Sequence, residues 1–122
     1  MSDLKILLVD DEKYTIDKYA KHLKRKYTNV YSSYDGLDAY KIYKEISPDV
    51  LVLDIHLPTM DGIDILRRIR KNDLDTKIIM ITAHSEDHLK NKAVALGANS
   101  YLIKPVSRYE LKEALSLVDK VI

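Results

Sequence analysis

Four short apolar runs in this sequence are each followed directly by side chains that suit phosphate chemistry. The runs are residues 4–9, followed by Asp10 and Asp11; 50–53, followed by Asp54; 77–81, followed by Thr82; and 100–103, followed by Lys104. In an open parallel α/β sheet, ligands bind just beyond the carboxyl ends of the strands. If the four runs lie side by side, three carboxylates, a hydroxyl and an ammonium group meet in one crevice. That arrangement indicates phosphate chemistry with a divalent cation.

The three carboxylates differ in how far packing alone explains them. Asp10 and Asp11 could simply begin a helix, since acidic side chains favour the positive end of the helix dipole. However, two adjacent acids beside a buried strand repel each other and lose hydration, and a bound Mg²⁺ ion would offset both costs. Asp54 contributes nothing to packing at the end of so apolar a run, and its charge needs a partner. The sequence therefore favours a functional Asp54 and leaves both interpretations open for the other two.

Thr82 and Lys104 would bring groups that bind phosphoryl oxygens. Thr82 alone is a weak signal because threonine is common in strands, but a hydroxyl at that position can donate a hydrogen bond to a phosphate. Lys104 precedes Pro105, which restricts the backbone before it and allows a cis peptide bond. The ammonium group would then point into the crevice. A lysine exposed to solvent is the alternative interpretation.

The histidines and Tyr101 give weaker signals. His84 and His88 have the i, i+4 spacing of a metal-binding pair, but no third ligand candidate accompanies them, so they are interpreted as surface residues at a helix entry. His22 is predicted to lie on a solvated helix face, and His56, two residues after the candidate acceptor, at the mouth of the crevice. Among the nine tyrosines, which are mostly packing residues, Tyr101 on the last strand is the functional candidate.

Length and composition restrict the class of protein. The chain has 122 residues, which is the size of one domain. Lys and Arg number 20 against 19 Asp and Glu, and a net charge of +1 gives no electrostatic case for binding nucleic acid or a membrane surface. Without cysteine the chain has neither a disulfide framework nor a thiolate metal site. No secretion signal or run of membrane-spanning length is present, which predicts a soluble, cytoplasmic protein.

Short apolar runs alternate along the chain with segments of helical periodicity. Apolar residues follow helical spacing over 16–27, 37–46, 65–69, 89–96 and 111–118. Asp35, Asp61 and a capping box of Ser107 and Glu110 mark helix starts, and Gly97 marks a helix end. Five strand–helix units in succession predict a parallel sheet with helices on both faces. The polar run 29–34 belongs at an edge, whereas 4–9, 50–53 and 77–81 are predicted to be central strands.

Four motifs together resemble the signature of response-regulator receiver domains. They are Val9-Asp10-Asp11-Glu12, Asp54-Ile55-His56-Leu57-Pro58-Thr59-Met60-Asp61-Gly62, Ile81-Thr82-Ala83 and Lys104-Pro105. The resemblance extends over essentially all 122 residues, and Leu57, where many members carry Met, is a volume-conserving change. It implies a flavodoxin-like (βα)5 three-layer sandwich with strand order 2-1-3-4-5. It further implies a single receiver domain over residues 1–122, with no output domain in this chain.

The resemblance also implies a phosphoacceptor and a metal site. Asp54 would accept a phosphoryl group from a sensor histidine kinase or a phosphotransfer protein. Asp11 and Asp54 would ligate Mg²⁺ directly, together with the backbone carbonyl of His56. Asp10 would hold the ion through water, and Mn²⁺ or another divalent cation can substitute for Mg²⁺.

Further residues would respond to the phosphoryl group. Thr82, Lys104 and the backbone N–H of Ala83 would contact its oxygens, and Thr82 and Tyr101 would form a switch. Structural residues at the site would be Gly62 and Pro105. The face of the fourth helix, fifth strand and fifth helix would then change, controlling a downstream effector or a C-terminal output domain. A homodimer that forms on phosphorylation is a further expected partner, and no binding of nucleic acid or membrane is expected.

Two other classes of protein use similar groups. A Mg²⁺-dependent aspartyl phosphatase of the haloacid-dehalogenase pattern needs a second Asp two residues after the nucleophile, where this chain has His56, and an inserted cap segment. A flavin- or nucleotide-binding module needs a glycine-rich loop after the first strand, where none of the three glycines lies. A receiver that only binds partners would not be expected to keep the whole set of site residues. The resemblance to receiver domains implies that the chain catalyses its own phosphoryl transfer and a slow autodephosphorylation, rather than conventional enzymatic turnover.

Overall fold

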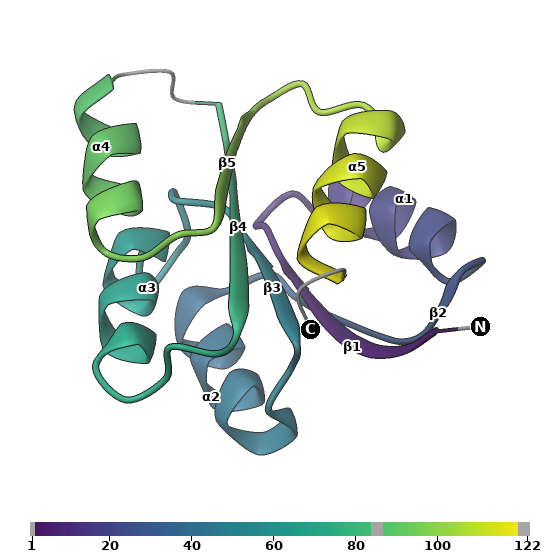
Figure 1. Ribbon diagram of the computed structural model, residues 1–122, viewed down its shortest axis with the longest axis horizontal. Helices are drawn as coiled ribbons and strands as arrows, with labels where there is room; N and C mark the ends of the chain where they lie inside the picture. The colour runs from purple at the N-terminus through teal and green to yellow at the C-terminus, as the bar shows by residue number, and fades with distance from the viewer. Residues whose placement is uncertain (1, 84–86, 120–122) are drawn as a thin grey trace.

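The computed structural model describes residues 2–83 and 87–119 and contains a sheet of five parallel strands (Figure 1). The strands are β1 (Ser2–Val9), β2 (Tyr27–Ser33), β3 (Val50–Leu53), β4 (Lys77–Thr82) and β5 (Ser100–Ile103). Their order across the sheet is β2-β1-β3-β4-β5, as the resemblance implied. The predicted edge strand is therefore confirmed, and so are the three central strands.

Helices cover both faces of this sheet. They are α1 (Lys13–Leu23), α2 (Gly36–Ile46), α3 (Gly62–Arg70), α4 (Asp87–Ala95) and α5 (Arg108–Asp119). α1 and α5 lie on one face, and α2, α3 and α4 lie on the other (Figure 1). This confirms the predicted three-layer, flavodoxin-like architecture.

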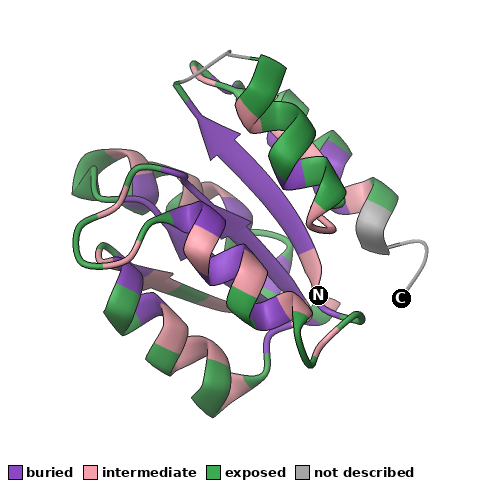
Figure 2. Cartoon of the chain, turned by 90° about the vertical axis from the view of Figure 1, so that its left-hand side faces the viewer, coloured by how far each residue is buried: buried purple, intermediate pink, exposed green. Residues whose placement is uncertain are grey.

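The central strands supply residues to a separate hydrophobic core on each face. Ile6 and Leu8 of β1 belong to the core beneath α1 and α5. Leu7 and Val9 belong to the core beneath α2, α3 and α4. Successive side chains of a strand point to opposite faces, so a strand covered on both sides must be apolar throughout. All four residues of β3 are accordingly buried, and Figure 2 shows the buried positions concentrated in the middle layer.

The helix boundaries predicted from capping residues are confirmed. The carboxylates of Asp35 and Asp61 each accept a hydrogen bond of 2.9 Å from the backbone N–H three residues further on. Ser107 and Glu110 accept from each other's backbone N–H groups at 3.1 and 3.2 Å. Gly97 follows α4 with a φ of 106°, in the left-handed region that favours glycine.

One predicted helix boundary is wrong. Tyr27 continues the apolar spacing of the preceding helix, but α1 ends at Leu23 and Tyr27 is the first residue of β2. Tyr27 is paired with Ser2 in the register of β1 and β2, and its side chain is 2% exposed. Pairing between strands decides its conformation, and helical periodicity carries no information about that pairing.

Candidate functional site

The residues predicted to do chemistry meet at the carboxyl end of the sheet. Asp10 directly follows β1, Asp54 directly follows β3, Thr82 ends β4 and Lys104 directly follows β5. All strands run in the same direction, and Val9 is in register with Leu53, so these positions lie at one edge. The convergence predicted from the sequence is therefore present in the folded chain.

Three carboxylates converge in this crevice. One oxygen from each of Asp10, Asp11 and Asp54 can be chosen so that all lie within 4.8 Å of one another. Asp10 and Asp54 are buried, at 3% and 6% exposure, whereas Asp11 is exposed. Asp10 Oδ1 accepts a hydrogen bond of 3.0 Å from the backbone N–H of Glu12, and Asp54 Oδ1 accepts one of 3.3 Å from that of His56. The cluster is thus open to solvent on the side of Asp11.

Lys104 provides the positive charge that faces these carboxylates. Its Nζ lies 2.6 Å from Asp10 Oδ2 and 3.1 Å from Asp54 Oδ2. The Lys104–Pro105 peptide bond is cis, as the sequence allowed, and the backbone N–H of Lys104 donates to the Thr82 carbonyl at 2.8 Å. The alternative of a lysine directed into solvent is therefore wrong.

Burial and charge shift the ionisation of this cluster. Burial raises the pKa of the Asp54 carboxyl above its ordinary value, although the hydrogen bond from Lys104 opposes this shift. Burial alone would lower the pKa of Lys104, but its bonds to Asp10 and Asp54 raise it to about 12. The lysine therefore stays charged, and its charge stabilises the ionised form of Asp54 against the cost of removing that carboxylate from water.

The donor set of the crevice fits a hard divalent cation. With all three carboxylates ionised, the single Lys104 ammonium leaves a charge of about −2 in a partly buried site, which a dication would balance. Carboxylate, carbonyl and water oxygens are the ligands that Mg²⁺ prefers. The exposed side at Asp11 leaves room for the waters that this ion retains.

The loop between β3 and α3 is fastened to the start of α2. The hydroxyl of Thr59, whose φ is 67°, donates to Asp35 Oδ1 at 2.9 Å and accepts from the backbone N–H of Leu37 at 2.9 Å. The Gly36 N–H donates to the Pro58 carbonyl at 3.0 Å. These contacts determine where the segment that carries His56 lies. In the sequence Asp35 is recognisable only as a helix cap, because its bond to Thr59 joins positions 24 residues apart and leaves no local signal.

Gly62 allows α3 to begin directly against the acceptor strand. Its N–H donates to the Ile55 carbonyl at 2.7 Å. A Cβ at this position would lie 2.1 Å from the carbonyl oxygen of Asp54. The close approach explains why glycine is needed there and fits the predicted structural role.

The remaining candidates differ in how far they are buried. Thr82 is completely buried, whereas Ala83 and His56 are exposed. Tyr101 is half-buried against the core beneath α3 and α4, and its neighbour in register is Met80. His88 is exposed on α4, as predicted. His84, predicted to be a surface residue as well, lies outside the described residues.

His22 differs from its prediction as a solvated residue. It is half-buried on α1, and its Nε2 is shielded from solvent without a hydrogen-bond partner among the described residues. The imidazole lines a groove between α1 and the start of α5. The helical spacing that placed His22 on an outer face did not reveal that it would line a groove beside the start of α5.

Residues 6–116 match the sequence model of the response regulator receiver domain. The signal receiver domain of a protein described as a Luxo repressor from Vibrio parahaemolyticus is 30% identical, with a TM-score of 0.92 over 98% of this chain and 92% of that one. A LuxR-family two-component response regulator from Aurantimonas sp. SI85-9A1 is 32% identical, with a TM-score of 0.86 over 98% and 87%. A CheY-like receiver domain protein from Methanospirillum hungatei JF-1 is 26% identical, with a TM-score of 0.91 over 98% and 96%.

This chain therefore belongs to the response regulator receiver domain family. Receiver domains are the phosphorylation-responsive modules of two-component signalling, in which they act with histidine kinases and output domains. In the part of the chain that the structure describes, no helix has the length and apolar character needed to cross a membrane.

Proposed function

We propose that this protein is a phosphorylation-controlled switch in which Asp54 accepts a phosphoryl group from a sensor histidine kinase or a phosphotransfer protein. The observation that carries the proposal is the meeting of Asp10, Asp11 and Asp54 within 4.8 Å beside the Lys104 ammonium. No packing argument requires three carboxylates at one end of an apolar sheet. Phosphoryl transfer does require a nucleophile, a cation and a fixed ammonium group at one point.

Asp54 is the acceptor in this proposal because the resemblance of residues 54–62 to the receiver signature gives it that role, and its buried carboxylate lies beside the Lys104 ammonium. One of its oxygens attacks phosphorus, the bond from phosphorus to the donor breaks with its electron pair leaving on the donor, and an acyl phosphate forms. Lys104, already 3.1 Å from Asp54 Oδ2, remains beside the new group and offsets its charge. The Thr82 hydroxyl and the Ala83 N–H donate to its other oxygens.

The divalent cation would be held by a set of oxygen ligands around the acceptor. These are the carboxylates of Asp11 and Asp54, the backbone carbonyl of His56 and, through water, Asp10. Mg²⁺ bound there, or Mn²⁺ in its place, would neutralise charge on the transferring group. The hydrogen bond from the Thr59 hydroxyl to Asp35 helps to hold the segment that would supply the carbonyl ligand.

Thr82 and Tyr101 transmit the change to the surface in this proposal. Phosphorylation adds negative charge beside Thr82, and movement of its hydroxyl toward that charge frees space for the Tyr101 ring. The surface of α4, β5 and α5 would then change shape, which is the expected form of a local charge event acting on a two-state element. A downstream effector, a C-terminal output domain or a second copy of the chain would bind the altered surface.

The proposal treats residues 1–122 as one receiver domain that works in the cytoplasm. A histidine kinase obtains its phosphoryl group from ATP, so its partner domain must be in the same compartment. Hydrolysis of the acyl phosphate by an in-line water returns the switch to its resting state.

Labelling with a small phosphodonor tests the assignment of Asp54. Acetyl phosphate with Mg²⁺ should add one phosphoryl group, measured by intact mass, that is stable in acid and labile in base. Asp54→Asn should abolish the addition and keep the fold, whereas Asp75→Asn, at the opposite end of the sheet, should be labelled like the wild type. Equal labelling of the Asp54→Asn variant would show that another residue is the acceptor.

A further inference from the structure

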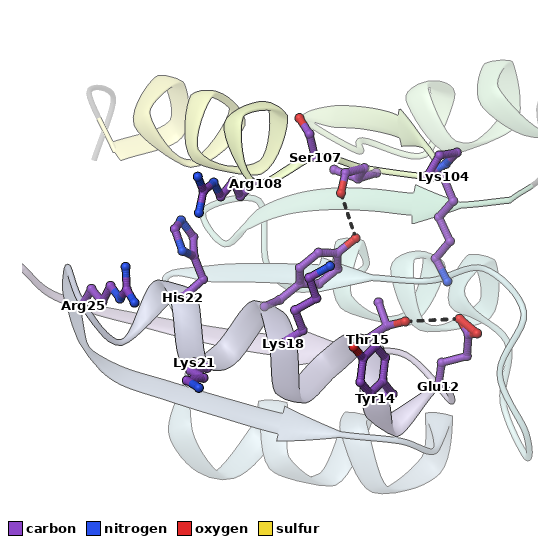
Figure 3. A pocket seen from close by; sticks show the side chains of 13 residues that line it. Glu12, Tyr14, Thr15, Lys18, Lys21, His22, Arg25, Lys104, Ser107 and Arg108 are labelled. Atoms are coloured by element: carbon purple, nitrogen blue, oxygen red, sulfur yellow. Dashed lines mark hydrogen bonds between the residues drawn. The ribbon is translucent and has the colours of Figure 1, made fainter.

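A groove outside the acidic crevice separates α1 from the segment that leads from β5 into α5 (Figure 3). Its volume is about 780 Å³, within the range of small-molecule sites. Lys104 and Glu12 lie at the end next to the crevice, and Arg25, His22 and Arg108 lie at the other end (Figure 3). The second end is remote from the acceptor, so its side chains are not explained by phosphoryl transfer.

The groove carries a concentration of unpaired positive charge. Lys18, Lys21, Arg25 and Arg108 line it, and none of these four forms an ion pair with another described residue. Glu12 is the one carboxylate among the described lining residues, and it accepts a hydrogen bond from the Thr15 hydroxyl at 3.3 Å. The whole chain has a net charge of only +1, so this groove concentrates cations that the composition does not reveal. Such a hollow attracts anions.

His22 lies among these cations. Its Nε2 is shielded from water and lacks a partner among the described residues. Loss of hydration and the nearby charges of Lys112, Arg108 and Arg25 lower the pKa of the imidazole below its ordinary value. The ring is therefore neutral at pH 7, and its nitrogens can donate a hydrogen bond or accept one. A shielded polar atom without a partner is costly, and a bound ligand would satisfy it.

The floor of the groove is apolar and fixed. The Tyr19 hydroxyl donates to the Val106 carbonyl at 3.3 Å, which ties α1 to the segment before α5, and both side chains pack on the core. Tyr14, 82% exposed, lines the groove nearer the crevice. Aromatic surface beside a cluster of cations suits a ligand that has both a ring and an anionic group.

We infer that this groove binds a compact small molecule that bears phosphate groups, of the size of a nucleoside di- or triphosphate. The phosphates lie between Arg25 and Arg108 and bond to the imidazole of His22, and the ring system lies toward Tyr14. An extended acidic protein segment would call for cations spread along a face, whereas Arg25 and Arg108 lie beside His22 at one end of this groove (Figure 3). The inference is independent of phosphorylation at Asp54.

Calorimetric titration of the whole chain in Mg²⁺-free buffer tests this inference. The probes are ATP, inorganic tripolyphosphate, adenosine and a polyglutamate peptide. ATP and tripolyphosphate should bind, ATP more tightly, and adenosine should show no measurable binding because the cations recognise phosphate. Binding of polyglutamate without binding of ATP would overturn the inference in favour of an acidic protein partner.

Charge reversal locates the site. Arg25→Glu with Arg108→Glu should weaken ATP binding at least about tenfold, since the change removes two charge-assisted bonds and places negative charge beside the phosphates. Lys41→Glu with Lys90→Glu, two exposed lysines on α2 and α4, makes the same change in net charge and should leave the affinity unchanged. Asp54→Asn should also leave it unchanged, which separates the groove from the acceptor site. Equal weakening in both double variants, or no binding of ATP at millimolar concentration, would overturn the inference.

Discussion

Arg70 and Lys104 are partly buried cations at opposite ends of the same sheet, and their surroundings differ in kind. Arg70, at the amino ends of β4 and β5, donates at 2.8–3.1 Å to the carbonyl oxygens of Gly97, Asp73 and Thr76 and to the side chain of Asn99. Lys104, at the carboxyl end, faces a cluster of three carboxylates and contacts two of them. The first cation is matched by neutral acceptors, whereas the second is outnumbered by negative charge.

The carboxylates at the two ends differ in the same way. Asp73 accepts hydrogen bonds from the hydroxyls of Tyr43 and Thr76 and from two backbone N–H groups. Burial alone would raise the pKa of Asp73, but these bonds hold it well below its ordinary value. At Asp54 burial prevails and the pKa is raised. At the amino end the charged groups of Arg70 and Asp73 are satisfied by hydrogen bonds within the chain. At the carboxyl end the excess negative charge needs a bound ligand to balance it.

Removal of Arg70 should produce the largest change in stability. Arg70→Ala removes the guanidinium donor from three backbone carbonyls and from the Asn99 side chain, and we expect the free energy of unfolding to fall by about 3 kcal/mol. Urea denaturation measures the change. Arg68→Ala, an exposed arginine on the same helix, should alter stability by less than about 0.5 kcal/mol. Equal effects of the two substitutions would mean that the network contributes nothing beyond an ordinary surface arginine.

At the acidic end of the sheet, substitutions should change Mg²⁺ binding and the stability of the Mg²⁺-free protein. Asp11→Ala should weaken Mg²⁺ binding between about ten- and a hundredfold, because Asp11 is a direct ligand in the proposed metal site. Without Mg²⁺ the variant should be more stable than the wild type, since repulsion in the cluster is reduced. Titration calorimetry and thermal melts measure the two effects. Glu12→Ala is the matched control, and unchanged Mg²⁺ affinity in Asp11→Ala would leave Asp11 as a helix-entry acid.

The two ends should show opposite dependence on pH. Folding lowers the pKa of Asp73, so the ionised carboxylate stabilises the folded protein above about pH 4. This contribution is lost as the pH falls toward the pKa of Asp73 in the folded protein. Asp73→Asn should therefore cost about 1–2 kcal/mol at pH 7 and less in acid. The pKa of Asp54 is raised, so Asp54→Asn should stabilise the Mg²⁺-free protein at pH 7, and this gain should disappear in acid. Urea titrations at pH 7 and pH 3 compare the variants, and shifts of the same sign would contradict the contrast.

The rim of the acidic crevice should have the smallest effect. His56 is exposed there, and His84 follows Thr82 by two residues in the sequence. If their imidazoles orient the water that hydrolyses the acyl phosphate, replacing both with Ala should lengthen its lifetime several-fold. Decay of the labelled protein, followed by mass, measures this, with His88→Ala as control. Faster decay in the double variant would show that the rings obstruct water.

The sequence by itself determined the strands, most helix boundaries and the identity of the converging groups. Local rules suffice for these features, because apolar runs and capping residues act within a few positions. Convergence of Asp10, Asp54 and Lys104 follows as soon as the strands are parallel, since every carboxyl end then lies at one edge.

Only the tertiary structure decided how far individual residues are buried and which distant residues they contact. Asp10 is buried and the adjacent Asp11 is exposed, although the sequence presents two identical acids. Arg70 meets Gly97 and Asn99 across 27 and 29 residues, and Tyr27 joins a strand through Ser2. The unpaired cations of the groove come together because α1 and α5 share one face of the sheet. Contacts between distant segments leave no periodic signal in the chain, so packing alone determines them.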